Sequence, residues 1–238
     1  MEFSIIIPAY QESKSIETCL KSLQPLRNDA EIIVVDGGSQ DNTVELSKPW
    51  ADRVISAPKG RARQMNAGAK LAKGKILLFL HADTHLPAGA LETIHQGLQG
   101  TYQWGRFDIE LTGEPFFLKV IASLINLRSR LSGIATGDQA IFVQRETFEK
   151  VGGFPDLPLM EDIALSKRLK ACSKPLCLKA KVISSGRRWE TFGVARIILL
   201  MWWLRFLYFI GVSPAKLATL YQTGRFLHSP WIPPWKAH

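Results

Sequence analysis

The chain has 238 residues, which is enough for one large domain with a substantial buried core. Its hydrophobic content of 46% is typical of a folded globular protein and excludes long disordered stretches. The 30 basic residues outnumber the 21 acidic ones and give a net charge of +9. This excess indicates an anionic partner, such as nucleic acid, an anionic membrane surface or a phosphorylated substrate, or else a solvated basic face.

The cysteines and the first residues bear on the cellular compartment. Cys19, Cys172 and Cys177 are odd in number and form no CxxC spacing. This pattern argues against a disulfide framework or a zinc site and fits a reducing compartment. Residues 1–8 lack a basic region and a long apolar run, so we expect no signal peptide and a cytoplasmic N-terminal region.

The first hundred residues alternate between short apolar runs and segments with helical spacing. The runs are continuous, which is typical of strands covered on both faces in a parallel sheet. Between them, apolar residues recur three and four positions apart, as on one face of a helix. This alternation predicts a doubly wound α/β domain with right-handed crossovers. The expected strands are Phe3–Ile7, Ile32–Val35, Val54–Ile55 and Ile76–Leu80, and the helical stripes include Ile16/Cys19/Leu20/Leu23, Ala62/Met65/Ala69/Ala72 and Leu91/Ile94/Leu98.

The second hundred residues mix strands and helices without a repeat or a low-complexity linker. Gly152 and Gly153 end one of the short helices. We expect strands at Trp104–Leu111, Ala140–Val143, Pro175–Leu178 and Val182–Ser184, and helices at Phe116–Leu131, Arg145–Val151 and Glu161–Ala171.

The segment Val194–Val212 is apolar except for Arg196 and Arg205. Its length nearly spans a bilayer, but Arg205 near its centre would cost about 2.5–3.5 kcal/mol on insertion scales. The two arginines would point to opposite sides of an ideal helix, which leaves no clean amphipathic stripe. Trp202 and Trp203 suit a membrane interface. We therefore expect an interfacial or re-entrant segment, with a helix buried against the main domain as the alternative.

Acidic and polar residues follow three of the predicted strands. Asp36 comes after Ile32–Val35, Asp83 comes after Ile76–Leu80, and residues 8–12 follow the first strand. An acid after a strand is usually a turn former or a helix cap. Three such clusters at the carboxyl edge of one sheet instead favour a ligand site, because open α/β sheets bind ligands there.

The phosphate-binding loops of common nucleotide enzymes are absent from the sequence. Neither G-x-x-x-x-G-K-[ST] nor a G-x-G-x-x-G after the first strand occurs, which disfavours P-loop and nicotinamide dinucleotide chemistry. A bound diphosphate would need another neutraliser, and a divalent cation on Asp83 would serve. Arg61 and Arg63 could assist, although they could equally be surface arginines at the start of a helix.

Four segments in order resemble the motifs of family 2 glycosyltransferases. Pro8–Glu12 resembles P-x-Y-N-E, and Val35–Thr43 resembles V-D-D-G-S-x-D-x-T. Leu80–Thr84 resembles the L-D-A-D-D metal motif, and Met160–Leu165 resembles the acceptor-side E-D motif. The resemblance runs over about residues 3–190. It implies a GT-A fold, which is a doubly wound, mostly parallel sheet flanked by helices, here with a C-terminal apolar helical appendage.

Three of the chain's departures from these motifs bear on the expected site. Gln11 replaces the usual Asn, Gly37 replaces the second Asp, and His81 stands where the metal motif normally has its first acid. The loss of that carboxylate leaves Asp83 as the expected metal ligand, with Mn²⁺ or Mg²⁺ as the cation. His81 would hydrogen-bond the sugar or a metal-bound water.

The resemblance implies a nucleoside-diphosphate sugar as donor. Asp36 would bind the base, the loop after the first strand would line the base and ribose pocket, and Asp83 would hold the cation on the diphosphate. Arg187 and Arg188 would close over the diphosphate, although they could equally belong to a basic surface turn. The donor-side residues are Pro8, Tyr10, Glu12, Asp36, Arg61, Arg63, His81, Ala82, Asp83, Arg187 and Arg188.

Asp162 would act as the general base of an inverting transfer, because it could take the proton of the acceptor hydroxyl during attack. Glu161 beside it could raise its pKa by like-charge repulsion. Without the resemblance, this acid pair is an ordinary helix N-terminal feature. The acceptor-side residues that the resemblance implies are Gly137, Asp138, Gln139, Glu161 and Trp189.

These inferences predict a catalytic domain at 1–190, with a nucleotide-sugar half at about 1–100 and an acceptor half at about 101–190, followed by a membrane-associated segment at 191–238. The predicted enzyme moves a sugar to a hydroxyl on a lipid or another membrane-borne acceptor at the cytoplasmic face of the membrane. A nucleotidyltransferase of related architecture is one alternative. A non-enzymatic basic protein that binds membrane or nucleic acid is the other, although the basic residues are scattered and no nucleic-acid motif occurs.

Overall fold

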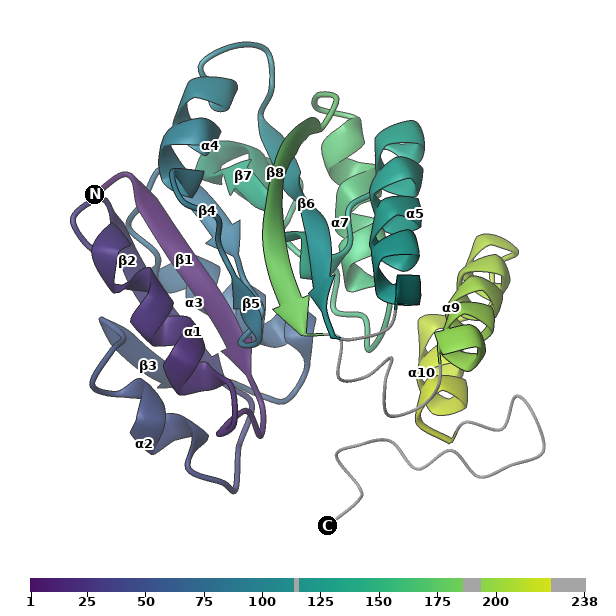
Figure 1. The fold of residues 1–238 in the computed structure, drawn as a ribbon, viewed down its shortest axis with the longest axis horizontal. Coiled ribbons are helices and arrows are strands. Elements are labelled where there is room, and N and C mark those ends of the chain that lie inside the picture. Colours follow the sequence, from purple (N-terminus) through teal and green to yellow (C-terminus); the bar gives the residue numbers. More distant parts are fainter. Residues whose placement is uncertain (114–115, 186–193, 224–238) are drawn as a thin grey trace.

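The computed structural model describes residues 1–113, 116–185 and 194–223. In this part of the chain one eight-stranded sheet, in the order β3-β2-β1-β4-β7-β6-β8-β5, lies between helices (Figure 1). Its strands are β1 Phe3–Ala9, β2 Ala30–Asp36, β3 Arg53–Ser56, β4 Ile76–Phe79, β5 Thr84–His85, β6 Trp104–Thr112, β7 Phe142–Gln144 and β8 Leu176–Ser185. The α-helices are α1 Ile16–Leu23, α2 Thr43–Ser47, α3 Arg61–Leu71, α4 Ala90–Leu98, α5 Phe116–Ser132, α6 Arg145–Lys150, α7 Glu161–Lys170, α9 Val194–Phe209 and α10 Pro214–Thr223, and the 3-10 turns are η1 Gln24–Leu26 and η2 Gly137–Gln139.

The first four strands are parallel and covered on both faces, as their continuous apolar runs predict. Ile5 and Ile7 pack on one side with α1, α4 and α5, whereas Ile6 packs on the other side with α3, α6 and α7. Successive residues of a strand point to opposite faces, so both sets are buried. Because β1, β2 and β4 run parallel, they end at the same edge of the sheet.

The second half of the sheet contains reversals. β7 runs antiparallel to both β4 and β6, and β5 runs antiparallel to β8. Four of the seven strand pairs are parallel, so the sheet is parallel in its majority but mixed. The reversal of β7 brings its first residues to the carboxyl end of β4, where Phe79 N–H donates to Ile141 O at 2.9 Å.

The two late strands predicted at Pro175–Leu178 and Val182–Ser184 are wrong as separate elements. They form the single strand β8, whose register shifts opposite Phe107 and Asp108 of β6. The shift absorbs the polar residues between the two apolar runs, and a bulge of this kind is not visible in hydrophobic periodicity.

Helix α9 packs on one side against the beginning of α7. Leu200 and Leu204 are buried with Leu217 of α10 against Met160 and Ile163, which flank the first residues of α7. The opposite side leaves large apolar residues exposed at Leu199, Trp202, Trp203, Phe206 and Phe209. No helix among the described residues is long and apolar enough to cross a membrane.

Candidate functional site

The loop after β1 is bonded to the loop after β2 by three backbone N–H groups. Each N–H donates to a side chain of the second motif, so those short polar residues set the shape of the first loop. The bonds join Gln11 N to Ser39 Oγ at 2.8 Å, Glu12 N to Thr43 Oγ1 at 2.8 Å and Ser13 N to Asp41 Oδ2 at 3.2 Å. Gln11 has a φ of 56°, a left-handed conformation that asparagine adopts more readily than glutamine.

Asp36 lies at the carboxyl end of β2 and is 4% exposed. Its carboxylate accepts the N–H of Gly38 at 2.8 Å and that of Ser39 at 3.0 Å. These bonds fix the orientation of the carboxylate at the carboxyl end of β2. Pro8 pairs in register with Val35 on the adjacent strand, so the Pro8–Glu12 loop starts beside Asp36.

Gln64 of α3 connects the carboxyl ends of β1 and β2. Its Nε2 donates to Ala9 O and to Val35 O, each at 2.8 Å, and the side chain is 3% exposed. A Cβ at Gly37 would lie 3.1 Å from Cδ of Gln64. The glycine that replaces the usual second acid therefore lies against this amide. Sequence reasoning missed Gln64 because the charged residues beside it, Arg61 and Arg63, drew the functional interpretation and an uncharged amide gives no such signal.

Replacement of Gln64 by leucine should lower the free energy of unfolding by about 1–3 kcal/mol. Val35 O would lose a buried donor, and Ala9 O would keep only its bond from Gly37 N. Urea unfolding measures the loss, with the exposed Gln96→Leu as the matched control. A stability equal to that of the control variant would show that this bridge does not hold the strand ends together.

Three basic residues surround Tyr10 and the start of α3. Lys59 Nζ stands 3.8 Å from the centre of the Tyr10 ring, a cation–π contact that presents one positive charge at the pocket. Arg61 is exposed and lies close enough to lower the pKa of His81. Arg63 is exposed and paired with Asp156, with Nε and Oδ1 2.8 Å apart. Lys59 and Arg61 thus bring positive charge to Tyr10 and to His81, respectively.

His81, Ala82 and Asp83 follow β4 directly. Burial and the charge of Arg61 lower the pKa of His81 to about 3, so its imidazole is neutral at physiological pH. The ring lies against Gly137, since a Cβ there would come within 2.6 Å of Nε2 of His81. The reversed strand β7 therefore places the Gly137–Gln139 turn beside the motif that follows β4.

Asp162 is held at the start of α7 by two backbone N–H groups. Gly137 N donates to Oδ2 at 2.9 Å, and Ile163 N donates to Oδ1 at 2.7 Å. Met160, the residue before α7, has a φ of 67°, an uncommon conformation for a residue with a side chain. His81, Gly137 and Asp162 thus form one continuous contact across the edge of the sheet.

Glu161 is 6% exposed and lies beside Asp162. Burial, together with the charge of Asp162, raises the pKa of Glu161 to about 7. The acid pair can therefore hold one proton near neutral pH, with the proton on Glu161.

The raised pKa of Glu161 predicts a pH-dependent effect of the Glu161→Gln substitution. Between pH 4.5 and about 7 the unfolded chain loses the proton that the folded chain keeps, so the wild-type protein loses stability as the pH rises. At 1.36 kcal/mol per unit, the full loss above pH 7 is about 3 kcal/mol. Urea unfolding should find Glu161→Gln more stable than wild type at pH 8, with little difference at pH 4.5. An equal difference at both values, as expected for the exposed control Glu149→Gln, would contradict the shift.

The remaining acceptor-side residues divide between the site and its frame. Asp138 follows Gly137, and its Oδ1 is buried without a partner. Gln139 is fully buried, accepts Thr136 N–H at 3.2 Å and thereby shapes the loop from within. Arg187, Arg188 and Trp189 lie outside the described residues.

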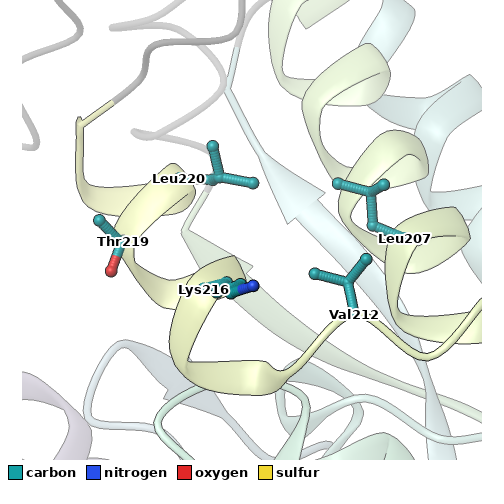
Figure 2. Close-up of a pocket in the computed structure, with 5 residues that line it drawn as sticks. All are labelled: Leu207, Val212, Lys216, Thr219 and Leu220. Carbon is teal, nitrogen blue, oxygen red and sulfur yellow. The ribbon is translucent and has the colours of Figure 1, made fainter.

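An open hollow between α9 and α10 lies away from these strand ends. Figure 2 shows Leu207 facing Leu220 across it, and Val212, Lys216 and Thr219 complete the lining. This lining has no acid or histidine, so the hollow lacks the groups that the strand-end site provides.

Comparison with known proteins bears on the family. Residues 4–106 match the profile of Glycosyl transferase family 2. The Escherichia coli (strain K12) glycosyltransferase YibD is 33% identical over 100 residues, which are 39% of this chain and 29% of that protein. Residues 4–106 thus carry the glycosyl transferase family 2 pattern. The matched motifs after β1, β2 and β4 all fall inside the matched range.

Two further similar proteins bear on fold and length. A Pyrobaculum calidifontis mannosyltransferase, solved with GDP-Man and Mn²⁺, superposes with a TM-score of 0.66 at 19% identity, over 95% of this chain and 70% of that one. This likeness confirms the GT-A fold. A Pseudomonas fluorescens (strain Pf0-1) undecaprenyl-phosphate 4-deoxy-4-formamido-L-arabinose transferase is 29% identical over 154 residues, 57% of this chain and 44% of that protein. The matches to the first curated relatives span only about a third of those proteins' lengths.

Proposed function

We propose that this protein is an inverting glycosyltransferase that moves a sugar from a nucleoside-diphosphate sugar to a hydroxyl of a lipid or another membrane-borne acceptor. The observation that carries the proposal is the contact chain His81–Gly137–Asp162. It joins the donor-side motif after β4 to a carboxylate fixed by two backbone N–H groups. A general base has to lie beside the acceptor hydroxyl that it deprotonates, and this chain of contacts supports such a position for Asp162.

Donor binding rests on the loops after β1 and β2. Asp36 offers a fixed carboxylate to the N–H groups of a nucleobase. Tyr10, in the loop after β1, offers an aromatic ring that also contacts Lys59. Arg61 stands at the start of α3, where a positive charge suits the diphosphate. The GDP-Man bound by the mannosyltransferase of the same fold supports a donor of this class.

Asp162 receives the proton of the acceptor hydroxyl as the oxygen attacks the anomeric carbon, opposite the departing diphosphate. Its two bonds from backbone N–H groups keep the carboxylate oriented. Glu161 keeps its own proton near neutral pH, so Asp162 is the member of the pair that is free to accept one. The neutral imidazole of His81 provides a hydrogen-bonding group for the sugar between them.

The residues fit a divalent cation that is shared with the donor. No group of three or more His, Cys, Asp or Glu side chains in the described part of the chain could hold a metal ion alone. Asp83 would hold Mn²⁺ or Mg²⁺ together with diphosphate oxygens and water, as magnesium sites with one carboxylate do. When bound, the cation supplies charge stabilisation for the leaving diphosphate.

The exposed apolar side chains of α9 support a peripheral contact with the cytoplasmic face of the membrane. Trp202 is 69% exposed and Phe209 is 82% exposed, which is unusual for such large apolar groups on a soluble surface. The undecaprenyl-phosphate specificity in the name of one relative supports a lipid acceptor.

The proposal is tested with the full chain and a panel of sugar nucleotides. Thermal shifts with UDP, GDP, UDP-glucose, UDP-N-acetylglucosamine and GDP-mannose, each with and without Mn²⁺, should show one nucleotide class that stabilises the protein more with metal. The best-bound donor should then release nucleoside diphosphate, with inverted configuration at the freed sugar. Release of pyrophosphate would instead indicate a nucleotidyltransferase. Salt-sensitive DNA binding without any nucleotide effect would indicate a non-enzymatic basic protein.

A further inference from the structure

Two arginines near Asp162 have buried nitrogen atoms without hydrogen-bond partners. Arg128 of α5 leaves Nε and Nη2 unpaired, and Arg205 of α9 leaves Nε unpaired. Oδ1 of Asp138 is also buried and unpaired beside them in the fold. A buried charged donor without a partner is costly, so a ligand or a function has to account for this group.

Neighbouring arginines show how the same fold satisfies a buried guanidinium. Arg106 is fully buried but pairs with Asp108 and donates to Asn126 O, although its Nε stays unpaired. Arg130 also meets Asp108, with Nη2 and Oδ2 2.6 Å apart. Within the described residues, Arg128 and Arg205 form no ion pair of this kind. The positive charges of these two arginines are thus not neutralised by an ion pair within that part of the chain.

The unpaired atoms come together on the acceptor side of Asp162. Asp138 directly follows Gly137, whose N–H holds the Asp162 carboxylate. Leu204, the neighbour of Arg205, packs on Met160 and Ile163 on either side of the acid pair. Helix α9 therefore closes over the beginning of α7 and brings Arg205 to this place.

The charges around these atoms favour an added anion. Burial, followed by the charge of Arg205, lowers the pKa of Arg128 to about 10, and Arg106 acts in the same direction while Asp138 and Asp162 oppose it. Burial raises the pKa of Asp138, with Asp162 adding to it, whereas Thr136, Arg205 and Arg128 lower it. The shift of Arg128 expresses its burial beside a second guanidinium, a positive charge that an added anion would offset, whereas the shift of Asp138 expresses its burial beside Asp162.

We propose that Arg128 and Arg205 form a subsite for a phosphoryl group carried by the acceptor, beside the proposed base Asp162. Phosphoryl oxygens accept several N–H bonds from arginine at once, and the unpaired Nε and Nη2 groups of two helices offer such donors. The subsite adjoins Gly137–Asp138 of the acceptor half, whereas the donor diphosphate has Asp83 and Arg61 at the ends of the parallel strands. This inference rests on the proposed function, and it narrows the acceptor to a phosphorylated hydroxyl compound.

The test measures binding of inorganic phosphate and of nucleoside diphosphate separately, in the full chain. Calorimetry and thermal shifts compare wild type with Arg128→Gln and Arg205→Gln, and with Lys119→Gln, an exposed position on α5, as the matched control. We expect phosphate to bind wild type and Lys119→Gln, and to bind each arginine variant at least tenfold more weakly. The affinity for the best nucleoside diphosphate with Mn²⁺ should stay within threefold in all four proteins.

A second readout separates a ligand site from a structural role. Without phosphate, Arg128→Gln should be as stable as wild type or more stable, because the substitution removes an uncompensated buried charge. A large loss of stability would mean that Arg128 holds the fold, and would overturn the proposal. Equal loss of nucleotide and phosphate binding would assign the arginines to the donor diphosphate and overturn it as well. Nucleotide binding without any phosphate binding in wild type would overturn this inference alone, whereas absence of nucleotide binding would count against the proposed function.

Discussion

Replacement of Asp162 by asparagine is expected to lower the rate of donor cleavage about 1,000-fold, within the range of 10²–10⁴ that general bases contribute. Asparagine has nearly the same shape but cannot accept a proton, and its amide can accept only one of the two N–H bonds from Gly137 and Ile163. The measurement is nucleoside diphosphate release from the best-bound donor with water as acceptor. Donor affinity, measured by calorimetry, should change less than threefold, because the substitution affects the reaction more than the donor pocket.

The surface substitution Asp29→Asn provides the matched control, since it removes an exposed carboxylate just before β2, at the end of that strand opposite Asp36. It should keep wild-type rates. Near-normal cleavage by Asp162→Asn would remove Asp162 as the base, and Glu161 would then be the next carboxylate to test.

Replacement of Asp83 by asparagine is expected to lower kcat/KM about 100- to 1,000-fold, which corresponds to about 3–4 kcal/mol. The carboxylate is the one negative side chain that follows β4, because His81 occupies the place of the other. In wild type, Mn²⁺ should tighten nucleoside diphosphate binding at least tenfold, and in Asp83→Asn this ratio should fall close to one. Nucleotide titrations with and without Mn²⁺ give all four affinities and hence the coupling between metal and nucleotide.

The coupling separates a metal ligand from a residue that merely shapes the pocket. A shape defect would weaken nucleotide binding equally with and without Mn²⁺ and leave the ratio intact. The same result in Asp83→Asn would show that the proposed metal ligand is wrong, as would undiminished wild-type activity in excess chelator.

These experiments test roles that the geometry of the site supports but that sequence motifs alone leave open. The motif residues fall into two groups, those that hold a loop in shape and those that present a carboxylate. Ser39, Asp41 and Thr43 hold the loop after β1, and Gln139 holds the loop before β7. Asp36, Asp83 and Asp162 instead present carboxylates at the edge of the sheet, and they are the residues whose substitution should change chemistry more than stability.

The apolar pattern of the sequence was enough to predict the first half of the fold and the edge of the sheet where a site should lie. Uninterrupted apolar runs belong to strands buried on both faces, and parallel strands end on the same side, so Asp36, Asp83 and the loop after β1 had to meet. Helix α9 was also visible, because sixteen apolar-rich residues with no proline or glycine favour a helix in any environment.

The way in which the second half of the chain packs against the first half became visible only in the folded structure. The antiparallel return of β7 against β4 brings Gly137 to His81 across more than fifty residues of sequence, and no local pattern encodes the direction of that strand. The bulge in β8, the bridge made by Gln64, and the unpaired Arg128 and Arg205 are likewise products of packing between distant elements. Periodicity reports which residues are buried, whereas the partners of a buried polar group depend on chain direction and on the elements packed around it.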